Sequence, residues 1–151
     1  MLGDNSKVIL MGPDGFNDSA TAKDAGSAAE GMYVTIGGQD PNKLTNATGR
    51  AFAAAFKKAY HVKQLEAYTA YGAQAFLVLA NAVQKSNGSR SSITQHLFSQ
   101  NFPNGVIGAF KIDATGDPSL GGVTVDQITN GTITPLVVVL PPASLAVKAL
   151  G

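Results

Sequence analysis

The first part of the chain alternates between strand-like and helix-like hydrophobic patterns. Residues 7–11 (KVILM) form a short apolar run that ends at a Gly-Pro pair, which predicts a buried strand followed by a loop. Asn17 or Asp18 is expected to cap a short helix that ends near Gly26. Residues 31–36 (GMYVTI) are rich in β-forming residues and predict a second strand. This order of elements, over about 30 residues, indicates a parallel β-α-β unit.

Three helical patterns follow in the middle of the chain. Residues 45–60 place alanine and phenylalanine on one face, with lysines in the last turn. Residues 68–84 are apolar nearly all round, which predicts a helix packed on several sides. A polar stripe interrupts this second pattern at Gln74, Asn81 and Lys85. The third helix is expected to begin at Ser89 or Ser91.

The last part of the chain has the pattern of β-structure. Strands are expected over residues 106–112, 123–128 and 133–140, and a short terminal helix over residues 143–150. Residues 113–117 form a glycine-containing turn, and Asn130-Gly131 is a strong hairpin turn sequence. Strands that alternate with helices predict an α/β fold.

Composition narrows the class of protein. The 151 residues are enough for one core, and 44% hydrophobic against 14% charged residues is typical of a globular protein. A net charge of +1 gives no basic face, so no nucleic-acid partner is expected. There is no cysteine, which excludes disulfides and thiolate chemistry. The first residues lack the pattern of a signal peptide, so a cytosolic chain is expected if Met1 is the natural start.

No pattern in the chain predicts catalysis. The two histidines, His61 and His96, have no spacing that would bring them together with carboxylates as a metal site or a catalytic dyad. Phosphate-binding, dinucleotide-binding, zinc-protease and serine-hydrolase motifs are all absent. We therefore expect no enzyme activity, no metal and no cofactor.

Two residues are candidates for ligand contact. Asp14 follows the first predicted strand, at the edge where open α/β sheets bind ligands, and its carboxylate could pair with a ligand ammonium. The alternative is an ordinary turn aspartate before glycine. Tyr68 opens the long apolar helix, where an aromatic ring either lines a cleft or packs in the core.

The order of several short segments resembles a known family. The segments are residues 11–15 (MGPDG), 28–35 (AAEGMYVT), 52–60 (FAAAFKKAY), 67–73 (AYTAYGA) and 110–117 (FKIDATGD). Together they resemble the C-terminal portion of the branched-chain amino-acid (Leu/Ile/Val) substrate-binding proteins of ABC transporters, which are type I periplasmic binding proteins. The resemblance covers about residues 7–135 and rests on the order and spacing of the segments.

The resemblance implies an α/β fold of the periplasmic-binding-protein type I, with Rossmann-like parallel sheets flanked by helices in two lobes. Residues 1–36 and 123–151 would belong to the C-terminal lobe, and residues 38–122 to the N-terminal lobe. The hinge crossings would lie near residues 36–38 and 121–125. Family members are more than twice as long, so the chain is expected to be an incomplete two-lobed fragment that has exposed sheet edges.

The same resemblance implies a ligand site. An acid in the turn that matches MGPDG holds the ligand's α-ammonium, which points to Asp14 and its neighbour Gly15. An aromatic residue near the start of the long helix packs on the ligand, which points to Tyr68 and the adjacent Glu66. Asp14 stands where the closest matches have glutamate, so its carboxylate reaches one methylene less far. A different ligand position or class is therefore expected.

The implied function is that of an extracytoplasmic solute-binding component of an ABC importer. Its ligand would be an amino acid or a similar small molecule, its partner the ABC permease, and its location periplasmic or at the cell surface. The chain would carry only part of the ligand site, without a cofactor. Two alternatives stay open on the sequence, namely a self-associating interaction domain and a ligand-sensing domain of the same fold. A cytosolic α/β enzyme would need a catalytic motif that the sequence lacks.

Overall fold

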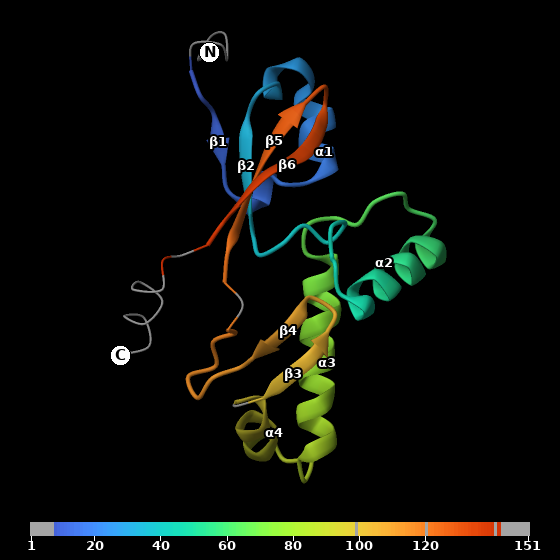
Figure 1. Cartoon of the computed structure of the whole chain (residues 1–151), viewed down its shortest axis with the longest axis vertical. Coiled ribbons are helices and arrows are strands. Elements are labelled where there is room, and N and C mark those ends of the chain that lie inside the picture. The colour runs from blue at the N-terminus through green and yellow to red at the C-terminus, as the bar shows by residue number, and fades with distance from the viewer. Residues whose placement is uncertain (1–7, 99, 120, 141, 143–151) are drawn as a thin grey trace. The chain divides into compact units, whose positions relative to one another are not determined.

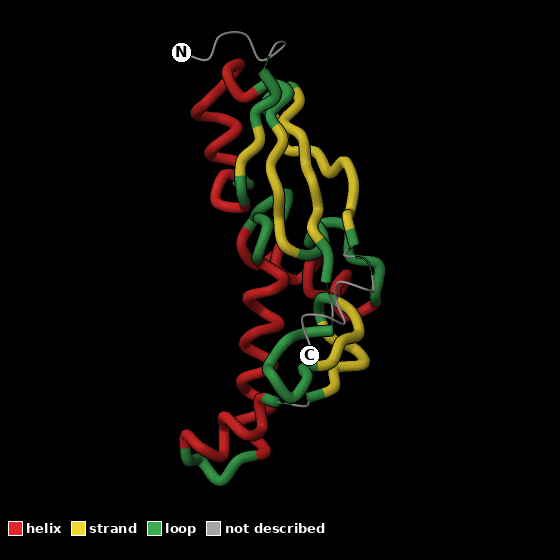
Figure 2. The backbone as a smooth tube through the Cα atoms, turned by 90° about the vertical axis from the view of Figure 1, so that its left-hand side faces the viewer, coloured by secondary structure: helices red, strands yellow, loops and turns green. Residues whose placement is uncertain are grey.

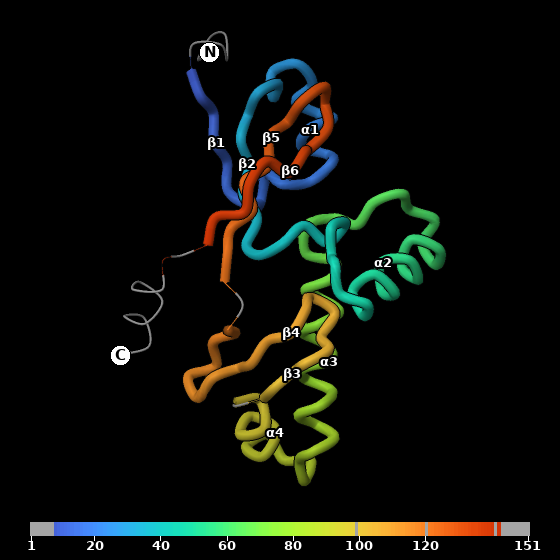
Figure 3. The backbone as a smooth tube through the Cα atoms, in the orientation of Figure 1, coloured from blue at the N-terminus to red at the C-terminus, as the bar shows by residue number. Residues whose placement is uncertain are grey.

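The computed structural model describes residues 8–98, 100–119, 121–140 and 142, which form two compact units. Unit 1 contains the residues up to Asp40 and those from Gly121 onward, so it is built from both ends of the chain (Figure 3). Unit 2 is Pro41–Leu120. The assignment of these units to the lobes of a larger receptor stays a prediction.

Unit 1 is a four-stranded sheet with a short helix (Figure 1). Its strands are β1 (Met11–Gly12), β2 (Tyr33–Gly37), β5 (Val123–Thr129) and β6 (Thr132–Val139), in the order β1-β2-β5-β6. The pair β1–β2 is parallel and the other two pairs are antiparallel. Helix α1 (Ser19–Ala25) connects the parallel strands through the short 3-10 helix η2 (Gly26–Ala29), which confirms the β-α-β unit.

The core of unit 1 lies between α1 and the sheet. It consists of Ala22, Ala29, Val34 and Ile128, with Met32 and Ile133 packed against them. Asp18 caps α1 by accepting a hydrogen bond from the N–H of Thr21 at 2.9 Å, as the sequence predicts. Through this cluster, the helical segments of unit 1 pack against its sheet.

The expectation of a buried strand over residues 7–11 is wrong for the residues that the structure describes. The strand has only two residues, and Ile9 and Met11 are 81% and 62% exposed. The reason is position in the sheet. β1 is an edge strand that pairs with β2 alone, and an apolar run is buried only when neighbours cover it on several sides.

The turn between β5 and β6 has the geometry that its sequence predicts. Asn130 and Gly131 have φ angles of 53° and 70°, and Thr129 pairs with Thr132 across a two-residue loop. Two successive positive φ angles are those of a type I′ turn, whose twist matches that of the flanking strands. The Asn-Gly pair therefore sets the register of the hairpin.

Gly131→Ala is expected to lower the free energy of unfolding by about 1 kcal/mol, because a Cβ at a φ of 70° is strained. Asn130→Gly in the same turn is the matched control and should change stability by less than about 0.5 kcal/mol. Urea denaturation followed by circular dichroism measures both values. An equal loss in the two variants would contradict a strained position at Gly131.

Unit 2 contains three helices and a two-stranded hairpin. Its elements are α2 (Ala47–Tyr60), α3 (Thr69–Lys85), α4 (Arg90–Leu97), β3 (Asn101–Gly105) and β4 (Gly108–Lys111). The core consists of Leu44, Ala70, Val106, Ile107 and Phe110. The three helices confirm the expected patterns, and Ser89 caps α4 through its side chain, which accepts the N–H of Ser92.

The single strand expected over residues 106–112 is a hairpin in the structure. Val106 and Ile107 form its turn, and β3 precedes them over residues 101–105 (NFPNG). This strand contains polar residues and a proline, so the hydrophobic pattern of the sequence does not predict it. Pairing with β4 and the stacking of Phe102 on Phe110, with ring centroids 5.0 Å apart, hold it in place.

The expectation that α3 is packed on several sides is also wrong. Its buried residues are Ala70, Gln74 and Ala82, so part of the polar stripe faces inward. The carbonyl oxygen of the Gln74 amide accepts the N–H of Val106 at 2.6 Å, and the amide of Asn81 donates to that of Gln100 at 2.6 Å. These bonds satisfy the buried N–H of Val106 and join the side chains of Asn81 and Gln100, whereas Nε2 of Gln74 is buried without a hydrogen-bond partner among the described residues.

The helix expected over residues 143–150 lies outside the described residues. Among the residues that the structure does describe, no helix is both long and apolar enough to span a bilayer.

Candidate functional site

The turn that carries Asp14 lies at the carboxyl end of β1. Residues Asp14–Phe16 form one turn of 3-10 helix, in which the N–H of Phe16 donates to the Pro13 carbonyl at 3.0 Å. The N–H of Asn17 donates to the Asp14 carbonyl at 2.9 Å. Asp14 and Gly15 are both exposed. Because β1 and β2 are parallel, this is the sheet edge at which ligands bind in open α/β folds.

A buried polar contact anchors this turn to the sheet. The side-chain amide of Asn17 donates to the carboxylate of Asp126 on β5 at 2.5 Å and to the Thr35 carbonyl on β2 at 3.3 Å. Asn17 and Asp126 are only 8% and 3% exposed. The backbone that places Asp14 is therefore tied to two neighbouring strands.

Sequence reasoning missed the contact between Asn17 and Asp126. The two residues are 109 positions apart in the sequence. Asp126 occurs in a strand (VTVDQIT) whose valines predict that the face opposite Asp126 is the buried one. In the structure the buried face of β5 carries Thr124, Asp126 and Ile128, whereas Val123 is 42% exposed. No local pattern indicates that a carboxylate and an amide will meet in the interior.

A second polar contact joins β2 and β5 where both strands approach the boundary of unit 1. The hydroxyl of Thr124 donates to the Gly38 carbonyl at 2.6 Å, and the N–H of Gly38 donates to the Gly122 carbonyl at 2.8 Å. Thr124 is 1% exposed. The two segments that leave unit 1 are thus bound to each other within that unit.

In unit 2, the candidates Glu66 and Tyr68 lie together at the start of α3. The N–H of Thr69 donates to the Glu66 carbonyl at 3.0 Å, and that of Gly72 donates to the Tyr68 carbonyl at 2.9 Å. The ring of Tyr68 is 42% exposed and contacts Tyr71 edge-on, with centroids 6.0 Å apart. Tyr68 is therefore not a core residue, because its ring is partly exposed to solvent.

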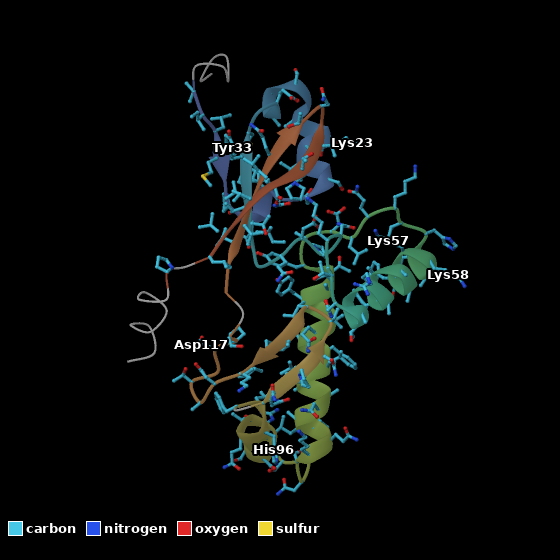
Figure 4. The ribbon with its side chains drawn as sticks, in the orientation of Figure 1. Lys23, Tyr33, Lys57, Lys58, His96 and Asp117 are labelled. Atoms are coloured by element: carbon cyan, nitrogen blue, oxygen red, sulfur yellow. The ribbon has the colours of Figure 1, made fainter. Side chains whose placement is uncertain are left out.

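The two histidines lie at the end of one helix and within another, and Asp113 and Asp117 belong to a hydrogen-bonded turn. His61 ends α2 in a left-handed conformation with a φ of 54°, and His96 lies on α4 (Figure 4). Asp113 accepts the hydroxyl of Thr115 at 2.8 Å and the N–H groups of the turn that leads to Asp117, and these bonds lower the pKa of its carboxyl. Within the described part of the chain, no three His, Cys, Asp or Glu residues are grouped as metal ligands.

Comparison with solved structures identifies the fold. The leucine-binding protein of Thermotoga maritima matches 88% of this chain with 26% identity and a TM-score of 0.77. A branched-chain amino-acid transporter substrate-binding protein of Streptococcus pneumoniae, solved with isoleucine, matches 88% with 23% identity and a TM-score of 0.69. A solute-binding protein of an ABC transporter from R. palustris, solved with benzoate, matches 91% with 22% identity and a TM-score of 0.67.

This chain spans 37% of the length of each of these three proteins. No family model matches the sequence, and no curated protein sequence matches it. The structural matches confirm the fold class and the resemblance that the sequence indicated, namely the type I periplasmic binding protein fold of branched-chain amino-acid substrate-binding proteins.

Proposed function

We propose that this chain, which has the fold of the branched-chain amino-acid substrate-binding proteins of ABC transporters, carries part of the ligand site of a solute-binding receptor. The observation that supports the proposal best is the Asp14 turn. It combines an exposed carboxylate at the carboxyl end of a parallel strand with a buried anchor, the Asn17–Asp126 contact. An exposed acid on an anchored turn is suited to bind a cation without a large loss of backbone entropy.

In this proposal, Asp14 accepts hydrogen bonds from a ligand ammonium, and the Gly15 backbone lets the ligand approach closely. A Cβ at Gly15 would have no neighbouring atom within 4 Å, so the space beside it is open. Tyr68 offers a half-exposed ring for the apolar part of the ligand, with Glu66 beside it. A ligand with an ammonium and an apolar side chain, such as an amino acid, has the chemistry for both contacts.

The two units are proposed to be the two lobes of such a receptor, with the ligand contacting both. Binding would then stabilise a closed state that a permease partner can recognise, since a ligand shifts a hinge equilibrium by its differential affinity for the two states. We propose binding without turnover, and a periplasmic or cell-surface location. The proteins of similar fold support this role, because their names describe them as transporter substrate-binding proteins or an extracellular ligand-binding receptor.

Asp14→Asn is expected to weaken binding of the cognate amino acid about 30-fold, or about 2 kcal/mol, because a charge-assisted hydrogen bond is lost. The measurement is isothermal titration calorimetry of the receptor that contains this sequence, with a panel of amino acids and benzoate. Asp24→Asn is the matched control, since Asp24 is an exposed acid on α1 of the same unit, and it should leave the affinity unchanged.

Equal affinity of the Asp14 variant and the wild type would overturn the role of Asp14. If the receptor bound only benzoate, its ligand would lack an ammonium group. The Asp14 turn would then have a role other than ammonium binding. Because the chain is proposed to carry part of the site, we expect the 151-residue chain alone to bind no amino acid at about 1 mM. Micromolar binding by that chain would show that it carries a complete site.

A further inference from the structure

The sequence contains three asparagine–glycine pairs, at residues 87–88, 104–105 and 130–131. In such a pair the backbone nitrogen of the glycine can attack the side-chain carboxamide of the asparagine, and glycine has no Cβ to hinder the attack. To reach the carboxamide, the peptide between the two residues must rotate about the Cα–C bond of the asparagine. A fold that holds this peptide with hydrogen bonds opposes the rotation, so the surroundings of each pair decide whether it reacts.

The pair Asn130-Gly131 is held in the turn between β5 and β6. Its φ angles of 53° and 70° are those of a type I′ turn. In this turn the ψ angle of the first central residue is about +30°, which places the Gly131 nitrogen on the far side of the Cα–C bond from the Asn130 side chain. The N–H of Asn130 also donates to the carboxylate of Glu30 at 2.9 Å. Rotation of the peptide would break the pairing of Thr129 with Thr132, so the turn prevents the attack.

The pair Asn104-Gly105 is held at the end of β3. Gly105 is buried, and its carbonyl accepts a hydrogen bond from the side-chain amide of Asn46 at 2.8 Å. The space around Gly105 is filled, because a Cβ there would lie 2.6 Å from the carbonyl oxygen of Gly108 and 2.7 Å from the amide oxygen of Gln74. The peptide therefore has neither the freedom nor the room to rotate, and this pair is protected as well.

The pair Asn87-Gly88 lies in the linker between α3 and α4, which is a loop in the lower part of Figure 2. Both residues are exposed, and a Cβ at Gly88 would meet no described atom within 4 Å. The N–H of Ser89 donates to the side-chain oxygen of Asn87 at 3.0 Å, which folds the carboxamide back over the following peptide and polarises its carbonyl. The N–H of Gly88, whose proton must leave, donates to the hydroxyl of Ser86 at 3.0 Å. Both bonds come from neighbours in the same loop, so this peptide can rotate and its carboxamide is activated.

We propose that Asn87 is a site of spontaneous self-modification, at which the Gly88 nitrogen displaces ammonia from the Asn87 carboxamide. The nitrogen forms a bond to Cγ, the Cγ–Nδ2 bond breaks, and the proton of the Gly88 N–H passes through water to the departing ammonia. The product is a cyclic imide, which water then opens at either carbonyl. Attack of water at Cγ gives aspartate. Attack at the backbone carbonyl gives isoaspartate, in which the main chain continues through Cβ and Cγ.

Both products change the molecule next to the start of α4. The new carboxylate brings the acidic residues from 10 to 11 against 11 basic residues, so the formal net charge falls from +1 to 0. Isoaspartate also lengthens the main chain directly before Gly88. Ser89 caps α4 by accepting the N–H of Ser92 at 3.2 Å, and this bond depends on the position of the linker. Conversion to isoaspartate should therefore loosen the first turn of α4.

Ageing of the folded 151-residue chain at mildly alkaline pH tests the proposal, with peptide mapping by mass spectrometry as the measurement. The conversion of amide to acid is followed at all three pairs in one sample, so two pairs are internal controls for the third. Asn87 should react at least about 10-fold faster than Asn104 or Asn130, a difference of about 1.4 kcal/mol in activation free energy. Such a difference corresponds to the one or two hydrogen bonds that the other two peptides must break. Enzymatic methylation specific for isoaspartate identifies that product.

The same chain unfolded in urea separates the effect of the fold from that of the sequence. The three rates should converge there, because no turn or strand holds the peptides. Asn87→Gln is the matched variant, since it keeps an amide at this position, and it should remove the fast conversion while circular dichroism verifies that it is folded. Equal rates in the folded chain, an equally large difference in urea, or fast conversion that persists in Asn87→Gln would each overturn the proposal. The reaction needs no ligand, so its failure would leave the proposed function untouched.

Discussion

Ile128→Ala is expected to lower the free energy of unfolding of unit 1 by about 2–5 kcal/mol. Ile128 is fully buried, and Ala22, Ala29 and Val34 belong to the same buried hydrophobic cluster of unit 1. Removing three carbon atoms there loses transfer free energy and leaves a cavity that a rigid sheet and helix cannot fill completely. The loss is large relative to the stability of a small domain, which is about 5–15 kcal/mol.

The matched control is Ile9→Ala, the same chemical change at a side chain that is 81% exposed. It should alter stability by less than about 0.5 kcal/mol. Urea denaturation of both variants, followed by circular dichroism, measures the difference in midpoint at constant slope. Equal losses at the two positions would contradict the core described for unit 1 and would favour the buried strand that the sequence alone predicts at residues 7–11.

Asn17→Ala is expected to destabilise unit 1 by about 2–3 kcal/mol, because the buried Asp126 carboxylate loses the amide that donates to it at 2.5 Å. The loss arises mainly from the desolvated acceptor left behind and less from the bond itself. Asn101→Ala, at an exposed asparagine on β3, is the control and should change stability by less than about 0.5 kcal/mol.

A double-mutant cycle with Asp126→Ala separates the pair from its surroundings. Losing both partners should destabilise less than the sum of the two single changes, by about 1–2 kcal/mol. Strict additivity would show that Asn17 and Asp126 do not interact in solution. Because Asn17 directly follows the turn of Asp14, Asn17→Ala should also weaken ligand binding in the receptor, with Asp14 itself unchanged.

Much of the local structure is predictable because local rules determine it. The cap at Asp18, the Asn130-Gly131 turn and the three helices follow from residues within a few positions of each other. The site is only partly predictable in this way. The position of Asp14 after a parallel strand follows from the β-α-β pattern, whereas its anchor does not. That anchor joins Asn17 to Asp126 on β5, 109 positions further along the chain. A contact between residues so far apart in the sequence produces no local sequence pattern.

The sequence by itself determined the succession of strands and helices except β3, the turn between β5 and β6 and the candidate acid at Asp14, because backbone propensity and periodicity act over a few residues. Tertiary structure alone decided which faces are buried. It placed Thr124 and Asp126 inward on a strand rich in valine, directed Gln74 and Asn81 of α3 toward the hairpin, and left Ile9 and Phe76 exposed. The physical reason is that burial depends on what covers a side chain, and polar groups can enter a core when distant partners satisfy their hydrogen bonds.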